Sequence, residues 1–215
     1  MKNIVILISG RGSNMEALIA ARDAGNLPVN IAAVISNRPE AEGLETAAKA
    51  SIVTHFVNHK AFAGREAFDA ALAECIDEFS PDLVVLAGFM RILSDGFVRH
   101  YEGRLINIHP SLLPSFPGLH THRRALEEGV RIHGCTVHFV TPTLDHGPVV
   151  IQAAVPVLDD DTEASLAARV LRHEHRIYPQ AVRWFAEDKL RLENGRVRLA
   201  ADLADSAVLI SPEVR

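Results

Sequence analysis

A short apolar run in the sequence ends by presenting two polar side chains that could act on a carbonyl group. In RLINIHPSLLPSFPG (104–118), strand geometry places Leu105, Asn107 and His109 on one face, because alternate residues of a strand share a face. Pro110 cannot donate a ladder hydrogen bond, so we expect the strand to end at His109. An amide that steadies a developing oxyanion and an imidazole that donates a proton would then lie side by side.

An aspartate in the later segment TLDHGP (143–148) could tune that imidazole. An aspartate two residues before a glycine, between two expected strands, is most often a turn former. If the fold brings Asp145 beside His109, its carboxylate would raise the pKa of the imidazole and suit it to donate a proton near neutral pH. A protein nucleophile is disfavoured, because Ser111 lies outside any G-x-S-x-G elbow and Cys135 lies in an apolar strand. The set therefore suits a reaction in which one substrate attacks a carbonyl group of the other.

The first strand-to-helix turn is a candidate anion site. In ISGRGSNMEAL (8–18), Gly10 and Gly12 allow a ligand to approach the backbone closely. Ser13 and Asn14 are expected to cap the following helix, whose N-terminus attracts negative charge. Two glycines alone are equally compatible with a tight turn that binds nothing. If the loop binds a ligand, a single phosphate such as that of a sugar phosphate fits best.

Dinucleotide binding is the main alternative for this turn. The third glycine of the G-x-G-x-x-G fingerprint is replaced by Met15, and the strand at 31–36 is followed by Asn37 and Arg38 where an acidic residue is expected. Arg38 could meet the 2′-phosphate of NADP, so this alternative stays open. A nucleotide triphosphate loop is excluded more firmly, because no G-K-[ST] follows the glycines.

Histidines are concentrated in one part of the sequence, so a metal site has to be considered. Seven of the eleven histidines lie between residues 100 and 146, and His120 and His122 would form the core of such a site. The sequence has no H-E-x-x-H, and HEH (173–175) lacks the partner one turn away that this motif needs. We expect most of these histidines to be surface residues or hydrogen-bonded structural residues, and a metal is not favoured.

Apolar, β-branched runs alternate with stretches of helical periodicity along most of the chain. We expect strands at 4–8, 31–36, 52–57, 82–88, 104–109, 134–140 and 149–157, and helices at 14–25, 43–51, 64–79 and 159–188. Pro179 is expected to interrupt the last helix, and Asn-Gly within 190–200 predicts a two-residue hairpin. This order predicts an α/β fold: a single domain with a mostly parallel twisted sheet, helices on both faces and a C-terminal β-hairpin.

The composition excludes several classes of protein. The 215 residues carry a formal charge of −5, with 48% apolar and 23% charged residues, as in an ordinary globular protein. The negative charge argues against a surface for nucleic acid or anionic lipid, and no apolar run approaches the roughly 20 residues that span a bilayer. The N-terminal apolar run is too short for a signal peptide. Two cysteines without a CxxC pair indicate a reduced, cytoplasmic protein.

Four segments carry a resemblance to a known family. NIHPSLLPSFPGLHTH (107–122) and GCTVHFVTPTLDHGPVVIQ (134–152) together resemble the folate-dependent formyltransferases. SGRGSN (9–14) and RVLRHEHRIYP (169–179) narrow the resemblance to members that formylate glycinamide ribonucleotide in purine biosynthesis. The resemblance runs from about residue 2 to residue 190. It implies a Rossmann-like formyltransferase domain at 1–200, with a phosphate-binding half (about 1–100) and a catalytic and folate-binding half (about 100–200), followed by a tail at 201–215.

The resemblance also implies an activity and roles for particular residues. The formyl group of 10-formyltetrahydrofolate, a co-substrate, would pass to the amine of 5′-phosphoribosylglycinamide, giving 5′-phosphoribosyl-N-formylglycinamide and tetrahydrofolate without a metal. The catalytic trio would be Asn107, His109 and Asp145. The ribonucleotide would be bound by Gly12, Ser13, Asn14, Leu171, Arg172, His173 and Glu174. The folate site would comprise Arg65, Met90, Arg91, Ile92, Leu93, Asn107, Thr141, Pro142, Thr143, Leu144 and Asp145.

The implied partners are these small molecules, with no nucleic acid and no membrane, and the protein would be a monomer or a homodimer. Two neighbours of the implied site leave open questions. His146 could compete for the carboxylate of Asp145. Arg11 could strengthen anion binding in the phosphate loop or could be solvated.

Other functions remain open at this point. A 10-formyltetrahydrofolate hydrolase, which uses water as the acceptor, is expected to carry an added N-terminal domain, whereas this sequence begins at the first strand. A methionyl-tRNA formyltransferase is expected to carry a sizeable C-terminal domain, whereas only a short segment follows the resemblance. Outside this family, the alternatives are an NADP-binding oxidoreductase or regulatory module that uses the same glycine turn, and an inactive relative that keeps the fold.

Overall fold

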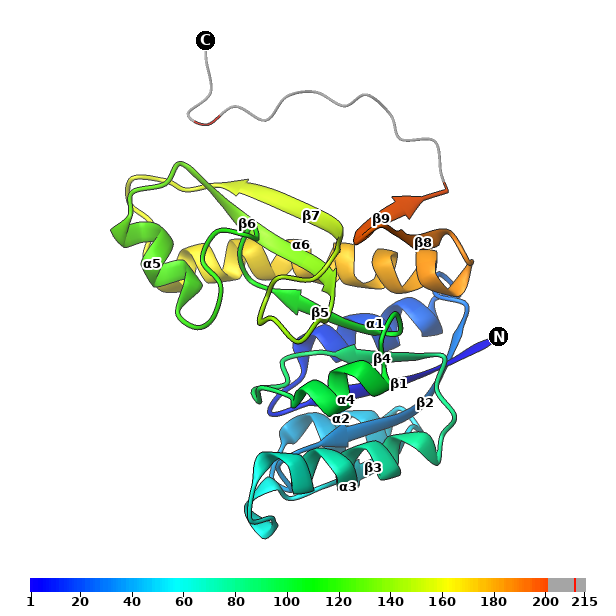
Figure 1. Ribbon diagram of the computed structural model, residues 1–215. Helices are drawn as coiled ribbons and strands as arrows, with labels where there is room; N and C mark the ends of the chain where they lie inside the picture. Colours follow the sequence, from blue (N-terminus) through cyan, green and yellow to red (C-terminus); the bar gives the residue numbers. More distant parts are fainter. Residues whose placement is uncertain (201–210, 212–215) are drawn as a thin grey trace.

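The computed structural model in Figure 1 describes residues 1–200 and 211, so nearly all of the tail expected at 201–215 lies outside the described residues. Its strands are β1 (Lys2–Ile8), β2 (Val29–Ser36), β3 (Val53–Phe56), β4 (Leu83–Leu86), β5 (Leu105–His109), β6 (Ile132–Phe139), β7 (Val149–Pro156), β8 (Leu190–Glu193) and β9 (Arg196–Leu199). Its helices are α1 (Ser13–Asp23), α2 (Glu42–Lys49), α3 (Arg65–Asp77), α4 (Asp95–His100), α5 (Thr121–Glu127) and α6 (Glu163–Ala186), with a 3-10 turn η1 (His59–Ala61).

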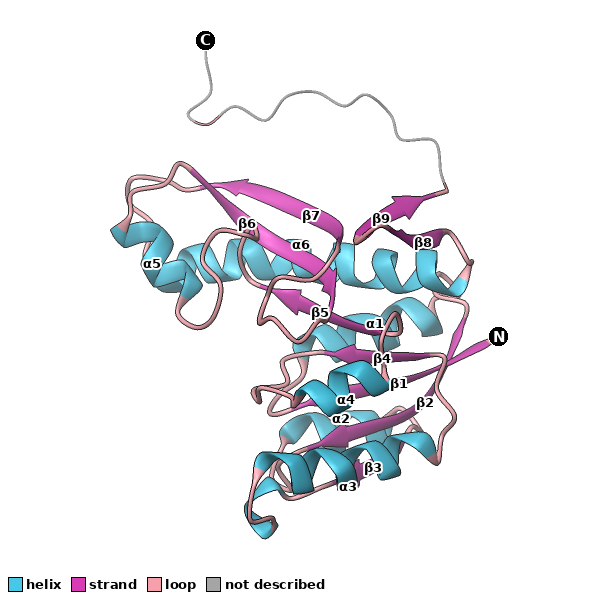
Figure 2. Ribbon diagram, in the orientation of Figure 1, coloured by secondary structure: helices cyan, strands magenta, loops and turns pink. Residues whose placement is uncertain are grey.

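The main sheet has seven strands in the order β3-β2-β1-β4-β5-β6-β7. The strands from β3 to β5 are parallel, whereas β6 and β7 are antiparallel to their neighbours, as the arrows in Figure 2 show. The prediction of a single α/β domain with a mostly parallel sheet is therefore confirmed. The strands that follow β1 in the sequence are added first on one side of it (β2 and β3) and then on its other side (β4 and β5). Such a reversal of strand order opens a crevice at the carboxyl ends of the strands.

Helices cover both faces of this sheet, and the central strand is apolar toward each of them. Ile4, Ile6 and Ile8 of β1 pack in the cluster that includes α1, α2, α5 and α6. Val5 and Leu7 pack in the opposite cluster with α3 and α4. All five side chains are 0% exposed, which explains why β1 is a continuous apolar run without the alternation of a strand that has one face in water.

Helix α6 continues through Pro179, and the expected interruption there is wrong. Tyr178 is fully buried, and its hydroxyl donates to the carbonyl oxygen of Leu86 at 2.8 Å. Ala181 and Val182, on the next turn, are buried in the same cluster. A proline removes one helical hydrogen bond, but burial of both halves of the helix against the sheet holds the axis across the gap.

The C-terminal hairpin is confirmed, because β8 and β9 pair with Asn194 and Gly195 at the turn. Both turn residues have positive φ (51° and 73°), which the favoured two-residue turns require. The sequence patterns did not predict α4, α5 or η1, which are all short. Across residues 1–200 and 211, none of the helices has both the length and the apolar character needed to cross a bilayer.

Candidate active site

Strand β5 presents its polar residues on one face of the sheet at its carboxyl end. Leu105 packs in the α3/α4 cluster, whereas Ile106 and Ile108 pack in the cluster with α1 and α6. The expected alternation is confirmed, and it directs Asn107 and His109 toward the α3/α4 face. The strand ends at His109, as the following proline predicted.

His109 lies between two oxygen atoms that can only accept hydrogen bonds. Its Nε2 is 3.0 Å from the carbonyl oxygen of Phe116, and its Nδ1 is 3.6 Å from Oδ2 of Asp145. The side chains of His109 and Asp145 are each 8% exposed. Nε2 lies within hydrogen-bond distance of the Phe116 carbonyl oxygen and donates to it, whereas Nδ1 faces the Asp145 carboxyl group at ion-pair distance. The structure thus brings Asp145 to His109, which residue spacing alone could not show.

The loop between β6 and β7 places Asp145 through backbone geometry. Asp145 has φ +50°, and its Oδ2 accepts a hydrogen bond from the Gly118 N–H at 2.8 Å. At Gly147 a Cβ atom would lie 1.7 Å from the carbonyl oxygen of Phe139, so only glycine lets the loop lie against the end of β6. This contact explains the Asp-x-Gly spacing. His146, between them, has an exposed side chain.

His138 is a neighbour of the site that the sequence patterns did not single out. It lies opposite Asn107 in the β5–β6 register and is 2% exposed. Its Nδ1 is 2.9 Å from the carbonyl oxygen of Phe139, so Nδ1 donates. Burial lowers the pKa of His138, and in the neutral ring Nε2 accepts from the Asn107 amide at 3.4 Å. One amide hydrogen of Asn107 is therefore held, and the other is directed elsewhere.

The glycine turn leads into α1 without a side-chain cap, so the expectation that Ser13 and Asn14 cap this helix is wrong. Gly12 is the N-cap residue, with φ +76°, a conformation that favours glycine. Ser13 and Asn14 form the first turn instead. The backbone N–H groups at the start of α1 are consequently left for another acceptor, and they carry the positive end of the helix dipole.

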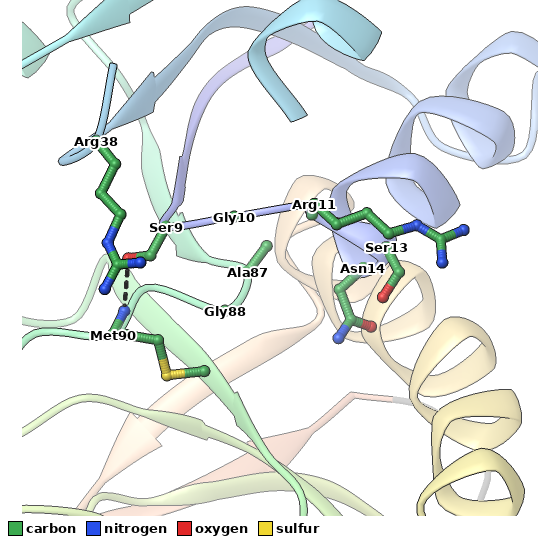
Figure 3. A pocket seen from close by; sticks show the side chains of 10 residues that line it. Ser9, Gly10, Arg11, Ser13, Asn14, Arg38, Ala87, Gly88 and Met90 are labelled. Carbon is green, nitrogen blue, oxygen red and sulfur yellow. Dashed lines mark hydrogen bonds between the residues drawn. The ribbon is translucent and has the colours of Figure 1, made fainter. Parts of the chain in front are cut away.

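A hollow of about 240 Å³ lies over this turn (Figure 3). Its wall is formed by residues 9–14 together with Arg38, Ala87, Gly88 and Met90. The side chain of Arg11 is 75% exposed and lies 3.8 Å from the carboxylate of Glu16, so in this structure Arg11 is solvated. The hollow therefore joins the glycine turn to the loop that follows β4.

The buried carboxyl group of Glu174 meets the glycine turn from the other side. Glu174 on α6 is 7% exposed, and its Oε2 accepts a hydrogen bond from Asn14 at 2.7 Å. Burial raises the pKa of Glu174, and the bond from Asn14 opposes that shift. Leu171 shares the face of Glu174, one turn away, whereas Arg172 is exposed and lies on the other side of the helix. His173 is partly buried.

Two loops expose apolar side chains on the α3/α4 side of the sheet. Met90 and Ile92, after β4, are 66% and 59% exposed, and Leu144, after β6, is 53% exposed. Leu93 and Val140, at the bases of the two loops, both pack against the α3/α4 cluster. The remaining members of the second loop are Thr141, Pro142 and Thr143, with Thr141 donating to the carbonyl oxygen of Thr143 at 3.1 Å. Large exposed apolar side chains on two loops that pack against the same cluster suit an apolar ligand.

Arg65 begins α3, and Arg91 reaches the first turns of that helix from the loop after β4. The Arg91 guanidinium is 5.0 Å from the centre of the Phe68 ring, and Arg65 is one helical turn before Phe68. The Arg65 side chain lies 3.5 Å from that of Glu66 and lines a second hollow, of about 580 Å³, between α3 and α4. Arg91 belongs to the exposed loop that bears Met90 and Ile92, and it links this loop to α3 through Phe68.

Two of the clustered histidines, His122 and His133, lie side by side. His122 Nδ1 lies 3.2 Å from His133 Nε2, and His120, the exposed N-cap of α5, is not part of the pair. Within residues 1–200 and 211 there is no group of three His, Cys, Asp or Glu side chains placed to hold a metal ion. Cys75 and Cys135 are free cysteines.

Stability is expected to fall in acid because of His133. Burial, followed by the nearby charge of His122, lowers the pKa of His133 from 6.5 to about 4. The unfolded chain takes up this proton below about pH 6.5, whereas the folded chain does so only near pH 4. Between pH 7.5 and pH 5 the free energy of unfolding should therefore fall by at most about 2 kcal/mol from this group.

Urea unfolding at these two pH values measures the effect. His133→Asn should show a smaller fall than the wild type, and His55→Asn, at an exposed position, should show the wild-type fall. Equal pH dependence in wild type and His133→Asn would contradict the assignment to His133.

Comparisons with known proteins give consistent matches. A sequence profile described as "Formyl transferase" matches residues 2–182. The phosphoribosylglycinamide formyltransferase of Escherichia coli (strain K12) is 55% identical over 190 residues, which cover 88% of this chain and 90% of that protein. Glycinamide ribonucleotide transformylase 1 from Symbiobacterium toebii superposes with a TM-score of 0.90 at 49% identity, covering 93% of this chain and 94% of that one. A formyltetrahydrofolate deformylase from Pseudomonas putida KT2440 superposes with a TM-score of 0.82 at 28% identity, covering 92% of this chain and 70% of that one.

Proposed function

Since the chain belongs to the formyl transferase family, we propose that it transfers the formyl group of 10-formyltetrahydrofolate to the amine of 5′-phosphoribosylglycinamide. The products are 5′-phosphoribosyl-N-formylglycinamide and tetrahydrofolate, in de novo purine biosynthesis. The observation that carries the proposal is the pairing of His109 with Asp145 at the end of β5, 3.6 Å apart. The folate is a co-substrate, and the reaction needs no metal. Two free cysteines agree with a reducing compartment, so we place the reaction in the cytoplasm.

The catalytic groups act on the formyl group of the folate. The substrate amine attacks the formyl carbon, and the carbonyl oxygen takes the negative charge of the tetrahedral intermediate. The free amide hydrogen of Asn107 donates to that oxyanion, and the positive charge of the His109 imidazolium stabilises it electrostatically, while the carboxylate of Asp145 stabilises the imidazolium. Collapse of the intermediate breaks the bond from carbon to the folate nitrogen. This nitrogen receives the proton that the attacking amine gives up, so the enzyme ends unchanged.

The ribonucleotide and its phosphate are assigned to the glycine turn and α6. The uncapped N–H groups at Gly12, Ser13 and Asn14 and the dipole of α1 suit a phosphate. Glu174, held by Asn14, reaches the glycinamide part as a hydrogen-bond acceptor, with Leu171 beside it. We keep Arg172 and His173 as proposed contacts of the more exposed part of the same ligand.

The folate is assigned to the two apolar loops and the arginines beside them. Met90, Ile92 and Leu93, with residues 141–144, offer apolar walls and backbone hydrogen bonds to the pterin ring. Arg65 and Arg91 place positive charge where the carboxylates of the folate glutamate can lie. This assignment puts part of the folate site before residue 100, so the proposed division into a phosphate-binding half and a folate-binding half is only approximate.

A two-acceptor assay tests this function. Purified protein receives 10-formyl-5,8-dideazafolate with or without glycinamide ribonucleotide, and loss of the formyl group is followed by absorbance. We expect turnover only when the ribonucleotide is present, with formation of the formylated ribonucleotide confirmed by mass spectrometry. Equal turnover in both arms would mean that water is the acceptor and would assign the chain to the deformylases. No turnover in either arm would contradict formyl transfer.

A further inference from the structure

A hydrogen-bond chain, buried at its centre and at one end, crosses the carboxyl ends of β1, β2 and β4. Ser9 directly follows β1, Asn37 directly follows β2, and Met90 lies in the loop after β4. The Ser9 hydroxyl accepts a hydrogen bond from the Met90 N–H at 2.7 Å and donates to Oδ1 of Asn37 at 2.6 Å. Figure 3 shows the bond between Ser9 and Met90 at the wall of the hollow. The chain therefore links the glycine turn to the loop that bears Met90, Arg91, Ile92 and Leu93.

The middle of this chain and its Asn37 end are buried. Ser9 is 5% exposed and Asn37 is 1% exposed. The Ser9 N–H also donates to the carbonyl oxygen of Gly88 at 3.1 Å, so Ser9 binds the second loop at two points. His59 Nδ1 donates to the carbonyl oxygen of Asn37 at 2.8 Å and fixes the far end. Separating the glycine turn from the loop after β4 would leave buried polar groups of Ser9 without partners, which costs free energy. The two loops are therefore expected to move together.

The proposed mechanism assigns no function to the Ser9 side chain. We propose that Ser9 is a positioning residue that couples the two substrate loops, so that the ribonucleotide on Gly12–Asn14 strengthens folate binding at Met90–Leu93. This inference rests on the proposed function, which assigns a ligand to each loop. Coupling between two equilibria is reciprocal, so the folate must strengthen ribonucleotide binding by the same factor.

A purely structural role for Ser9 makes a different prediction. If the hydroxyl only stabilised the fold, its removal would lower the free energy of unfolding and weaken each ligand alone. The ratio between folate affinities with and without the ribonucleotide would then stay the same. The coupling ratio is therefore the readout that distinguishes the two roles.

The test uses isothermal titration calorimetry with 5,8-dideazafolate, which lacks a formyl group and cannot react. In the wild type, saturating glycinamide ribonucleotide should lower the Kd of this folate about five- to tenfold. In Ser9→Ala the factor should drop to about one, and Ser9→Thr, which keeps a hydroxyl, should restore it. Ser36→Ala is the matched control, because Ser36 is fully buried and its hydroxyl accepts from the Arg38 N–H within its own turn at 3.0 Å. It should keep the wild-type factor.

A wild-type factor in Ser9→Ala, or no coupling in the wild type, would overturn the proposal. A wild type that binds both ligands without coupling overturns this inference alone, whereas a wild type that binds neither overturns the proposed function as well. If Ser9→Ala does not fold, the hydrogen exchange of wild-type residues 91–93, which do not line the hollow, decides the question. Added glycinamide ribonucleotide should slow exchange there without any folate, and unchanged exchange would overturn the coupling.

Discussion

His109→Ala is expected to lower kcat for formyl transfer by about 10²–10⁴-fold, because the variant loses the imidazolium that faces the developing oxyanion. The site offers no ready substitute at that position. Asp145, 3.6 Å from Nδ1, is a hydrogen-bond acceptor when ionised and can only repel an oxyanion. The Kd for 5,8-dideazafolate should change little, because we assign the folate to other loops. Steady-state kinetics and calorimetry on the same preparations measure both quantities.

His146→Ala is the control for this experiment. His146 is the exposed neighbour of Asp145, so its loss removes an imidazole near the site without touching the pairing of Asp145 with His109. Its kcat should stay within about threefold of the wild type, since surface substitutions have small effects. A His109→Ala enzyme with wild-type kcat would remove His109 from the mechanism. A clear rise in kcat in His146→Ala would show that His146 competes with His109 for the carboxylate, and a large loss would show that His146 itself takes part in the reaction.

The fold was predictable where local chemistry agrees with tertiary packing. Pro110 ends β5 because a proline cannot continue the ladder, and Asn194-Gly195 makes a hairpin turn because both residues tolerate positive φ. Pro179 shows where this reasoning fails. A local rule predicted a break, but the burial of Tyr178 and its hydrogen bond to a carbonyl group of β4 outweigh the missing helical bond. That contact joins residues far apart in the sequence, so no local pattern contains it.

The candidate site likewise has features that the sequence alone predicts and features that depend on tertiary structure. The juxtaposition of Asn107 and His109 follows from the two-residue period of one strand, so the sequence alone predicts it. The approach of Asp145 to His109 depends on where the β6–β7 loop lies, and only the family resemblance suggested it in advance. His138 required the antiparallel register that sets it opposite Asn107. The cap of α1 was mispredicted because Asn14 bonds to Glu174 on a distant helix instead of to its own backbone.

Asn107→Ala is expected to lower kcat by about 10²–10³-fold, the usual effect of losing one oxyanion donor. His138 Nε2, 3.4 Å from Nδ2, holds one amide hydrogen and thereby orients the other. The donor is thus set in place before the reaction begins. A preorganised donor helps the transition state more than the ground state, so KM should change less than kcat. Steady-state kinetics with glycinamide ribonucleotide and 10-formyl-5,8-dideazafolate separate the two parameters.

Asn30→Ala is the matched control for Asn107, because Asn30 is an exposed strand residue whose amide donates to Asn3 at 2.9 Å. Asn107→Ala combined with His109→Ala should cost less than the product of the single losses, since both groups act on the same oxyanion. Wild-type kcat in Asn107→Ala would show that the amide does not stabilise the oxyanion. A raised KM with unchanged kcat would make Asn107 a binding residue, leaving the oxyanion to His109 alone.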